Sequence, residues 1–421
     1  MIRCSPVKIQ AFVLAIICCS GFSFLMPLRI YMICFFLLLS LWINLERTKL
    51  KIIGQPLTYA FLAFLGIIIL GVGRSYDRSE TIKYIITFLS AASLILLKNS
   101  DEFYLSSLKY IKTGCKFVAI SICVQIIIPN IYRDYLYFLI QGGTNAISRL
   151  NKEVSQHIYS GIVGEKGEAA FLMVLAIILL LSECAYTKRF TRKDVLWLGV
   201  YLIALLLPAK RMLFAVAMLL IMLYVIFWTR GSRKVIAIGS CGFLGVVGYG
   251  IMLTVPSLNT LLNRFISFGG DDTANGRTYL WEHALKMFKE KSLFGYGYGS
   301  YNKYASEQGV ILTQTRSWES HAHCIYIQML GEIGLVGIIL FVLLNLVAIR
   351  MAVYLYKRKD YLNKNYFNYL FVGINIIILV LVYGLTGNII YYTNQIMIYS
   401  WGLGLLAYTY RYGLQSKELR K

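Results

Sequence analysis

The stretch that decides the fold is residues 324–349, CIYIQMLGEIGLVGIILFVLLNLVAI. An apolar run of about 20 residues spans the hydrocarbon core of a bilayer as a helix. Similar runs recur along the chain, which is 58% hydrophobic with a mean hydropathy of +0.64. The runs lack the alternating pattern of barrel strands, and only helices and closed barrels satisfy their backbone in lipid. The sequence therefore predicts an all-α, polytopic integral membrane protein.

About twelve such runs are predicted as transmembrane helices. The first is long and has no evident small-residue cleavage site, so we interpret it as a span rather than a signal peptide. The predicted spans are approximately residues 8–26, 28–45, 54–72, 81–97, 113–129, 161–182, 195–207, 211–228, 235–255, 324–349, 366–385 and 389–410.

Three segments follow from this order of spans. Residues 1–255 form an N-terminal transmembrane bundle of about nine spans. Residues 256–322 form one long polar loop that carries an amphipathic helix, and residues 323–421 form a C-terminal bundle of about three spans.

The net charge of +22 is explained by the way in which the chain crosses the membrane. With the N-terminus inside, seven cytoplasmic segments carry 24 Lys and Arg against seven Asp and Glu, whereas the long loop carries seven against six. Basic residues concentrate in cytoplasmic loops. We therefore expect both termini in the cytoplasm, the loop on the periplasmic side of a bacterial inner membrane, and no nucleic-acid partner.

The long loop is the one extended polar interval of the chain, and it is either a tether between spans or the working part of the protein. Its content of glycine, aromatic and ionisable residues favours a working role. Apolar residues recur near helical spacing from residue 278 to 288. We expect an amphipathic helix there, lying against the outer membrane surface.

Two arginines are candidate ligands for a phosphate group. Arg211 follows Lys210 at the start of a span, where positive-inside statistics disfavour a basic pair and a helix N-terminus favours an anion. Arg277 is expected in the first turn of the loop helix, where the helix dipole disfavours a cation. A bidentate contact with an anion explains either position better than a purely structural role. A snorkelling anchor is the alternative for Arg211.

The segment Gly295-Tyr-Gly-Tyr-Gly299, which contains Tyr298, is interpreted as a tight turn whose aromatic faces stack on sugars. A nucleotide-binding interpretation is rejected because no strand precedes it. His321 and His323 flank Ala322 directly before a span. They can be a metal pair, a tether or a general base, and no third ligand stands at an obvious spacing. No metal or cofactor is expected, and the nine cysteines lack CxxC spacing.

A weaker candidate lies at the start of the sixth predicted span. Glu165, Lys166 and Glu168 place three charges at the outer end of a helix, which is costly unless they pair or face a cavity. Arg149 stands shortly before them. We expect this segment to form a second wall of the same outward site.

Together these features resemble the O-antigen ligase and polymerase superfamily, often called the Wzy family. The similarity covers roughly residues 145–345. One difference is that the family often has His-Asn at the end of the loop, whereas Cys324 follows His323 here. The resemblance rests on the segments GIVGEKGEAAF (161–171), AKRMLFA (209–215), GRTYLWEHAL (276–285), FGYGYGSY (294–301) and HAHCIYIQMLGEIGLVG (321–337).

The resemblance implies an inverting, metal-independent glycosyltransferase whose donor is a glycan on a polyprenyl diphosphate, with undecaprenyl diphosphate as the expected carrier. Arg211 and Arg277 would stabilise the diphosphate leaving group, and His323 would activate or orient the acceptor hydroxyl. The further expected substrate-binding residues are Arg149, Glu165, Trp281, Tyr298, Arg316 and His321.

An O-antigen polymerase that joins lipid-linked repeat units is the predicted function. An O-antigen ligase that transfers glycan to lipid A-core is the alternative. A twelve-span transporter is the rival of another class, but it predicts internal symmetry, and the sequence shows no repeat. A non-catalytic scaffold is the least favoured. The expected partners are undecaprenyl-diphosphate-linked oligosaccharides, membrane lipids and a membrane protein that regulates chain length.

Overall fold

The computed structural model forms two compact units, each described separately below. Unit 1 comprises residues 1–18, 30–107 and 269–421, and unit 2 comprises residues 19–29 and 108–268. The three predicted segments divide the chain by topology, and that division stays a prediction. The structure describes residues 5–19, 28–48, 54–137, 150–151, 154–229, 271–308, with side chains from 277, and 321–413.

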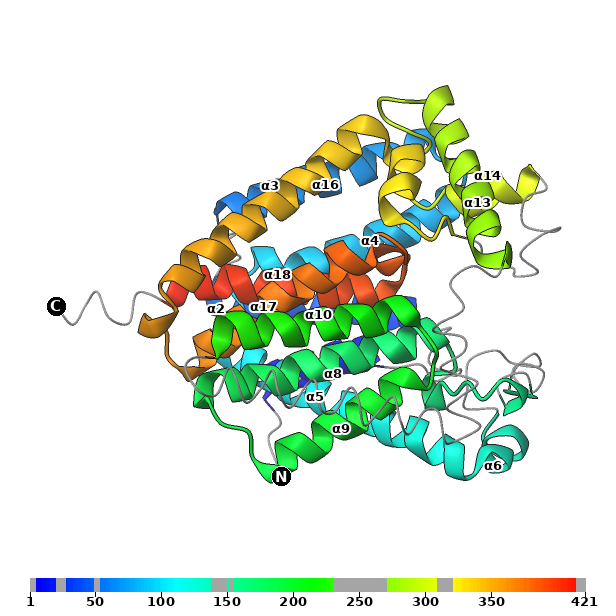
Figure 1. Ribbon diagram of the computed structural model, residues 1–421. Coiled ribbons are helices and arrows are strands. Elements are labelled where there is room, and N and C mark those ends of the chain that lie inside the picture. Colours follow the sequence, from blue (N-terminus) through cyan, green and yellow to red (C-terminus); the bar gives the residue numbers. More distant parts are fainter. Residues whose placement is uncertain are drawn as a thin grey trace. The chain divides into compact units, whose positions relative to one another are not determined.

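Unit 1 is a bundle of long helices (Figure 1). α3 and α16 run side by side, and α18 packs against α4 and α17. Its elements are α1 (Pro6–Cys19), α2 (Arg29–Thr48), α3 (Pro56–Leu70), η2 (Gly71–Arg74), α4 (Arg78–Leu96), the start of α5 (Asp101–Ile127), α13 (Asp271–Glu290), α14 (Tyr301–Glu307), α16 (Ile325–Lys357), η6 (Lys359–Tyr361), α17 (Lys364–Tyr383), η7 (Ile389–Tyr391) and α18 (Thr393–Tyr412).

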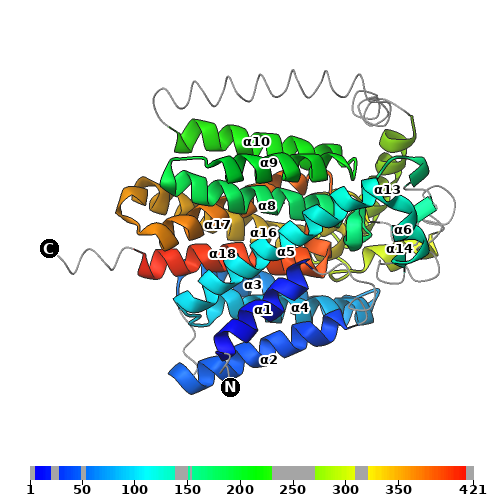
Figure 2. The same ribbon diagram turned by 90° about the horizontal axis from the view of Figure 1, so that it is seen from below.

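Unit 2 contains the rest of α5 and a layer of three helices in which α8 packs against both α9 and α10 (Figure 2). Its other elements are α6 (Pro129–Asp134), η5 (Gly161–Val163), α8 (Lys166–Thr187), α9 (Arg192–Leu206) and α10 (Arg211–Trp228).

Eight of the described helices are long and apolar enough to cross a membrane, which confirms a multi-pass, all-α protein. These helices begin at Arg29, Pro56, Arg78, Asp101, Lys166, Arg211, Ile325 and Lys364. The predicted first and seventh spans form the shorter helices α1, of 14 residues, and α9, of 15 residues. The predicted span 235–255 lies outside the described residues. The count of twelve therefore stays a prediction.

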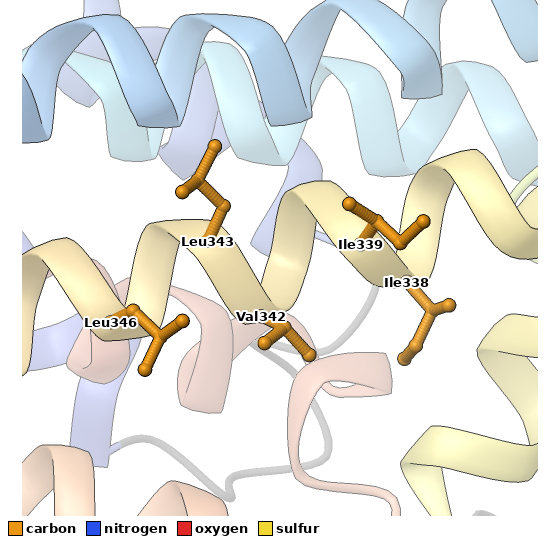
Figure 3. A pocket seen from close by; sticks show the side chains of 5 residues that line it. All are labelled: Ile338, Ile339, Val342, Leu343 and Leu346. Carbon is orange, nitrogen blue, oxygen red and sulfur yellow. The ribbon is translucent and has the colours of Figure 1, made fainter.

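One face of α16 exposes the large apolar side chains that are expected of a helix in lipid. Its large apolar residues Leu335, Ile339, Val342, Leu343 and Leu346 are each between 44% and 57% exposed. Ile338, Val342 and Leu346 recur every fourth residue, and with Ile339 and Leu343 they line an open, apolar depression of about 240 Å³ on this helix (Figure 3). Such exposure of apolar side chains in a helix of this length is favourable only in hydrocarbon.

Replacing Val342 with Lys is expected to lower the amount of membrane-inserted protein. A Lys near the centre of a span costs about 2.5–3.5 kcal/mol of insertion free energy. The measurement is the amount of protein in carbonate-washed membranes. Val342→Ala is the control, because it keeps the face apolar and is expected to insert normally. Equal insertion of the two variants would show that this face does not meet lipid.

Candidate functional site

The site in unit 1 is built on a break in α16. Gly334 has φ 65° and ψ −169°, so the helix is interrupted there. Residues 292–297 lie against this break, and the amide of Gly297 donates to the carbonyl of Glu332 at 2.7 Å. Gly295 has φ +63°, and a Cβ on it would lie 2.4 Å from the carbonyl group of Glu332. The glycine-tyrosine segment is therefore a tight turn, as predicted, because two backbones touch.

The side chain of Glu332 fixes the second half of that turn. Its Oε2 accepts the amide of Gly299 at 2.8 Å. Its Oε1 accepts the amide of Tyr301 at 2.9 Å and the side-chain amide of Gln328 at 3.2 Å. Glu332 has no exposed surface. A buried carboxylate is stable only when its oxygens are hydrogen-bonded, and this one accepts three donors.

Tyr298 does not offer a face to a sugar, contrary to our expectation. Its side chain is 0% exposed, and its hydroxyl donates to the carbonyl of Ile390 at 2.6 Å. Its ring stacks on Tyr391 at 4.8 Å and meets Tyr84 edge-on at 5.0 Å. The two tyrosines of the turn lie on different sides of it, and Tyr298 is the one that faces the core. Tyr296, on the other side, keeps part of its ring exposed.

The loop helix is present as α13, and one expectation about it is wrong. It begins at Asp271, so Arg277 lies in its second turn and the helix dipole does not explain that residue. Part of its apolar face is covered by protein, whereas Leu285 is 39% exposed, and the expected contact of this helix with the membrane surface stays a prediction. Leu280, Ala284 and Met287 form one buried cluster with residues of α14, and α13 packs against α16.

Both histidines of the His321-Ala-His323 segment are positioned by contacts on the residue between them. The indole of Trp281 donates to the carbonyl of Ala322 at 2.7 Å, and the amide of Ala322 donates to Oε1 of Gln328 at 3.0 Å. His323 has φ 52°, a conformation that costs free energy for a non-glycine residue. Such backbone strain persists where neighbours hold it, and it is concentrated at functional sites.

His321 is a buried, neutral imidazole. Burial lowers its pKa to about 4, and the neighbouring His323 acts in the same direction. Its Nδ1 lies 3.4 Å from the amide of Gln328, and its ring packs on Tyr391 at 5.5 Å. A group with this pKa stays neutral between about pH 5 and 8, so activity lost on acidification in that range does not come from protonation of His321.

Arg277 lies one helical turn before Trp281, on the same side of α13, because residues four apart are neighbours on a helix. It is partly buried. Among the described residues, no carboxylate forms an ion pair with its guanidinium group. Arg277, for which the described side chains supply no acidic partner, therefore stands one turn from Trp281, the residue that holds Ala322.

The predicted residues of unit 2 are placed at helix starts. Arg211 is the first residue of α10, as expected. Glu165 is the N-cap of α8, where its carboxylate accepts the amide of Glu168 at 2.5 Å. That contact gives Glu165 a structural role. Arg149 and Arg316 lie outside the described residues.

Sequence reasoning did not assign a role to three polar residues of the unit 1 site. Gln328 and Glu332 face the histidine segment and the turn from one side of α16. Their spacing of four inside an apolar run was the available signal, since polar residues in spans are usually functional or paired. Asn388, between α17 and α18, contacts His323 at 3.4 Å. A single asparagine in a connection gives no such signal.

Part of the sequence is similar to known proteins. The sequence model of a family described as O-antigen ligase matches residues 195–342. The exopolysaccharide production protein ExoQ of Rhizobium meliloti (strain 1021) is 30% identical over 194 residues, which cover 42% of this chain and 38% of that protein. The chain therefore spans less than half the length of this relative. Residues 195–342 are therefore similar to the O-antigen ligase family, and part of the chain is similar to an exopolysaccharide production protein.

Proposed function

We propose that this protein is a glycosyltransferase of the bacterial inner membrane that transfers a glycan from a polyprenyl diphosphate to an acceptor hydroxyl on the periplasmic side. The observation that carries the proposal is the geometry of His323. It is held in a strained conformation beside Asn388, and the residue before it is held by Trp281, one turn from Arg277. His323, Trp281 and Arg277 lie in the region that matches the O-antigen ligase family, residues 195–342, and Asn388 lies beyond it.

The proposed reaction is a single displacement. His323 takes the proton of the acceptor hydroxyl, and the oxygen attacks the anomeric carbon opposite the diphosphate. The bond from the anomeric carbon to the diphosphate oxygen breaks, its electron pair leaves with the diphosphate, and the anomeric configuration inverts. Arginine side chains stabilise the charge that develops on the leaving group. Arg277 is the candidate in unit 1, and Arg211 is the candidate in unit 2.

The acceptor distinguishes two versions of this function. In a polymerase, the acceptor is another carrier-linked repeat unit, and the name of ExoQ, an exopolysaccharide production protein, supports polymer synthesis. In a ligase, the acceptor is lipid A-core, and the description of the matching family as O-antigen ligase supports that version. We favour the polymerase, with undecaprenyl diphosphate as carrier and a chain-length-regulating membrane protein as partner.

The lipid-linked glycans of a deletion strain test the proposal. Loss of a polymerase leaves single repeat units on the carrier, whereas loss of a ligase leaves full-length chains that are not attached to lipid A-core. Retention of the lipid-linked product on the cytoplasmic side would indicate a transporter instead. An unchanged glycan profile would contradict the proposal.

Replacing Arg277 with Ala is expected to lower the rate of glycan transfer about 100-fold, because one preorganised donor to a developing anion contributes about that much. Arg277→Lys is expected to recover only part of the rate, since an ammonium group cannot make a bidentate contact. The measurement is chain length in a deletion strain complemented with each variant. Lys289→Ala is the matched control, because Lys289 is an exposed cation on the same helix. Full-length chains with Arg277→Ala would exclude this role.

A further inference from the structure

The connection between α17 and α18 is fixed against the start of α16. The amide of Ile325 donates to the carbonyl of Gly384 at 2.9 Å, and the hydroxyl of Tyr326 donates to the carbonyl of Leu381 at 2.7 Å. A Cβ on Gly384 would lie 2.5 Å from the side chain of Ile325, so the two segments are in close contact. Residues 384–388 therefore have a defined position relative to His323.

Asn388 uses that position to contact the imidazole. Its side-chain amide lies 3.4 Å from Nδ1 of His323, and only 5% of the residue is exposed. The other end of the amide, Oδ1, is buried and has no partner among the described residues. A buried amide with one unpartnered end is uncommon in a protein interior. This contact is therefore a candidate for a role in the reaction.

The contact determines which nitrogen of His323 carries the proton. An amide can present either its NH₂ group or its oxygen to Nδ1. Presenting NH₂ requires an unprotonated Nδ1, so the neutral ring then carries its proton on Nε2. Presenting the oxygen requires a protonated Nδ1 and leaves the lone pair on Nε2. Each orientation leaves one end of the amide without a partner, so the hydrogen bonds of the amide do not distinguish the two orientations. The proposed reaction does distinguish them, because a general base needs a lone pair on Nε2.

We propose that Asn388 is a positioning residue that accepts the Nδ1 proton of His323 through its side-chain oxygen and keeps Nε2 available to take the proton of the acceptor hydroxyl. The inference rests on the proposed function of His323. Asn388 touches neither substrate in this role. It acts through the imidazole, as the carboxylate does in a hydrolase triad.

The kinetic test compares two substitutions with opposite expectations. Asn388→Asp keeps an acceptor and is expected to keep kcat within about threefold. Asn388→Leu removes the acceptor and is expected to lower kcat about 30-fold with KM nearly unchanged, because an orienting partner affects the chemical step. The probe is the polyprenyl-diphosphate-linked glycan extracted from the deletion strain. Equal loss in Asn388→Asp and Asn388→Leu, or no loss in Asn388→Leu, would overturn the proposal.

Two controls separate positioning from folding. Asn375→Leu alters an equally buried asparagine of α17, 5% exposed, whose amide donates to the backbone carbonyl of Phe371 in the same helix. It is expected to leave kcat unchanged. Asn388→Ala serves if the leucine does not fit, and it is expected to match the loss predicted for Asn388→Leu. A loss of kcat in Asn375→Leu as large as that in Asn388→Leu would attribute the effect to folding and reject positioning.

A spectroscopic test does not depend on activity. The sequence has four histidines, so ¹⁵N-histidine labelling gives few imidazole signals, and His323→Gln identifies those of His323. In purified protein in liposomes at alkaline pH, we expect Nδ1 of His323 to be protonated, and the proton to move to Nε2 in Asn388→Leu. A proton on Nε2 in the wild type would overturn the proposal. An active His323→Gln enzyme would instead refute the proposed role of His323 while leaving the tautomer result standing.

Discussion

Replacing His323 with Ala is expected to abolish long-chain glycan while the protein remains inserted. Removing a positioned general base lowers a rate by about 100-fold or more, and a lower transfer rate shortens the product. The residue is partly exposed, so the substitution opens no large cavity in the core. The measurement is the chain-length distribution in a complemented deletion strain, with the amount of the variant in the membrane determined in parallel.

His283→Ala is the matched control for this experiment. His283 is a partly buried histidine of the same unit, and its ring meets Tyr279 edge-on at 4.8 Å on α13 itself. We expect a normal chain length with this variant. If His323→Ala also made chains of normal length, His323 would have no part in proton transfer, and the proposed mechanism would fail.

The sequence predicted the helical membrane fold because apolar length is a local property. Residues 324–349 are identified as a span without knowledge of any neighbour, and α16 confirms it. The tight turn at 295–299 was also predictable, since three glycines within five residues permit positive φ. Which side of that turn faces the core depends on α4 and η7, so Tyr298 was assigned wrongly.

The contacts of the site come from residues far apart in the chain. Asn388 meets His323 across a separation of 65 residues, and Trp281 meets Ala322 across 41. No periodicity or spacing in one sequence encodes such a pair, because it depends on how α13, α16 and α17 pack. The start of α13 was missed for a related reason. The acidic and polar residues 271–275 resemble a loop that caps a helix, and they form its first turn instead.

Replacing Glu332 with Ala is expected to destabilise unit 1 by about 3 kcal/mol or more, because each buried donor left without an acceptor costs about 1–3 kcal/mol. The carboxylate accepts the amides of Gly299 and Tyr301 and the side chain of Gln328. The substitution leaves these donors unpaired and opens a cavity. The measurement is the temperature at which half of the purified, detergent-solubilised protein loses its monodisperse elution peak.

Glu332→Gln also removes an acceptor of these hydrogen bonds, but it keeps the volume of the side chain. One oxygen of the amide can still accept a hydrogen bond, but its NH₂ group faces a second donor, so we expect an intermediate loss of stability. Glu290→Ala is the control, because Glu290 is exposed and accepts the hydroxyls of Tyr296 and Tyr304 near the protein surface. Its effect is expected to stay below about 1 kcal/mol.

Since Gln328 binds both Glu332 and the amide of Ala322, loss of the carboxylate also releases the histidine segment. Glu332→Ala is therefore expected to lower activity at temperatures where the variant is still folded. Full activity there would show that the turn held by Glu332 is not needed to position the histidine segment.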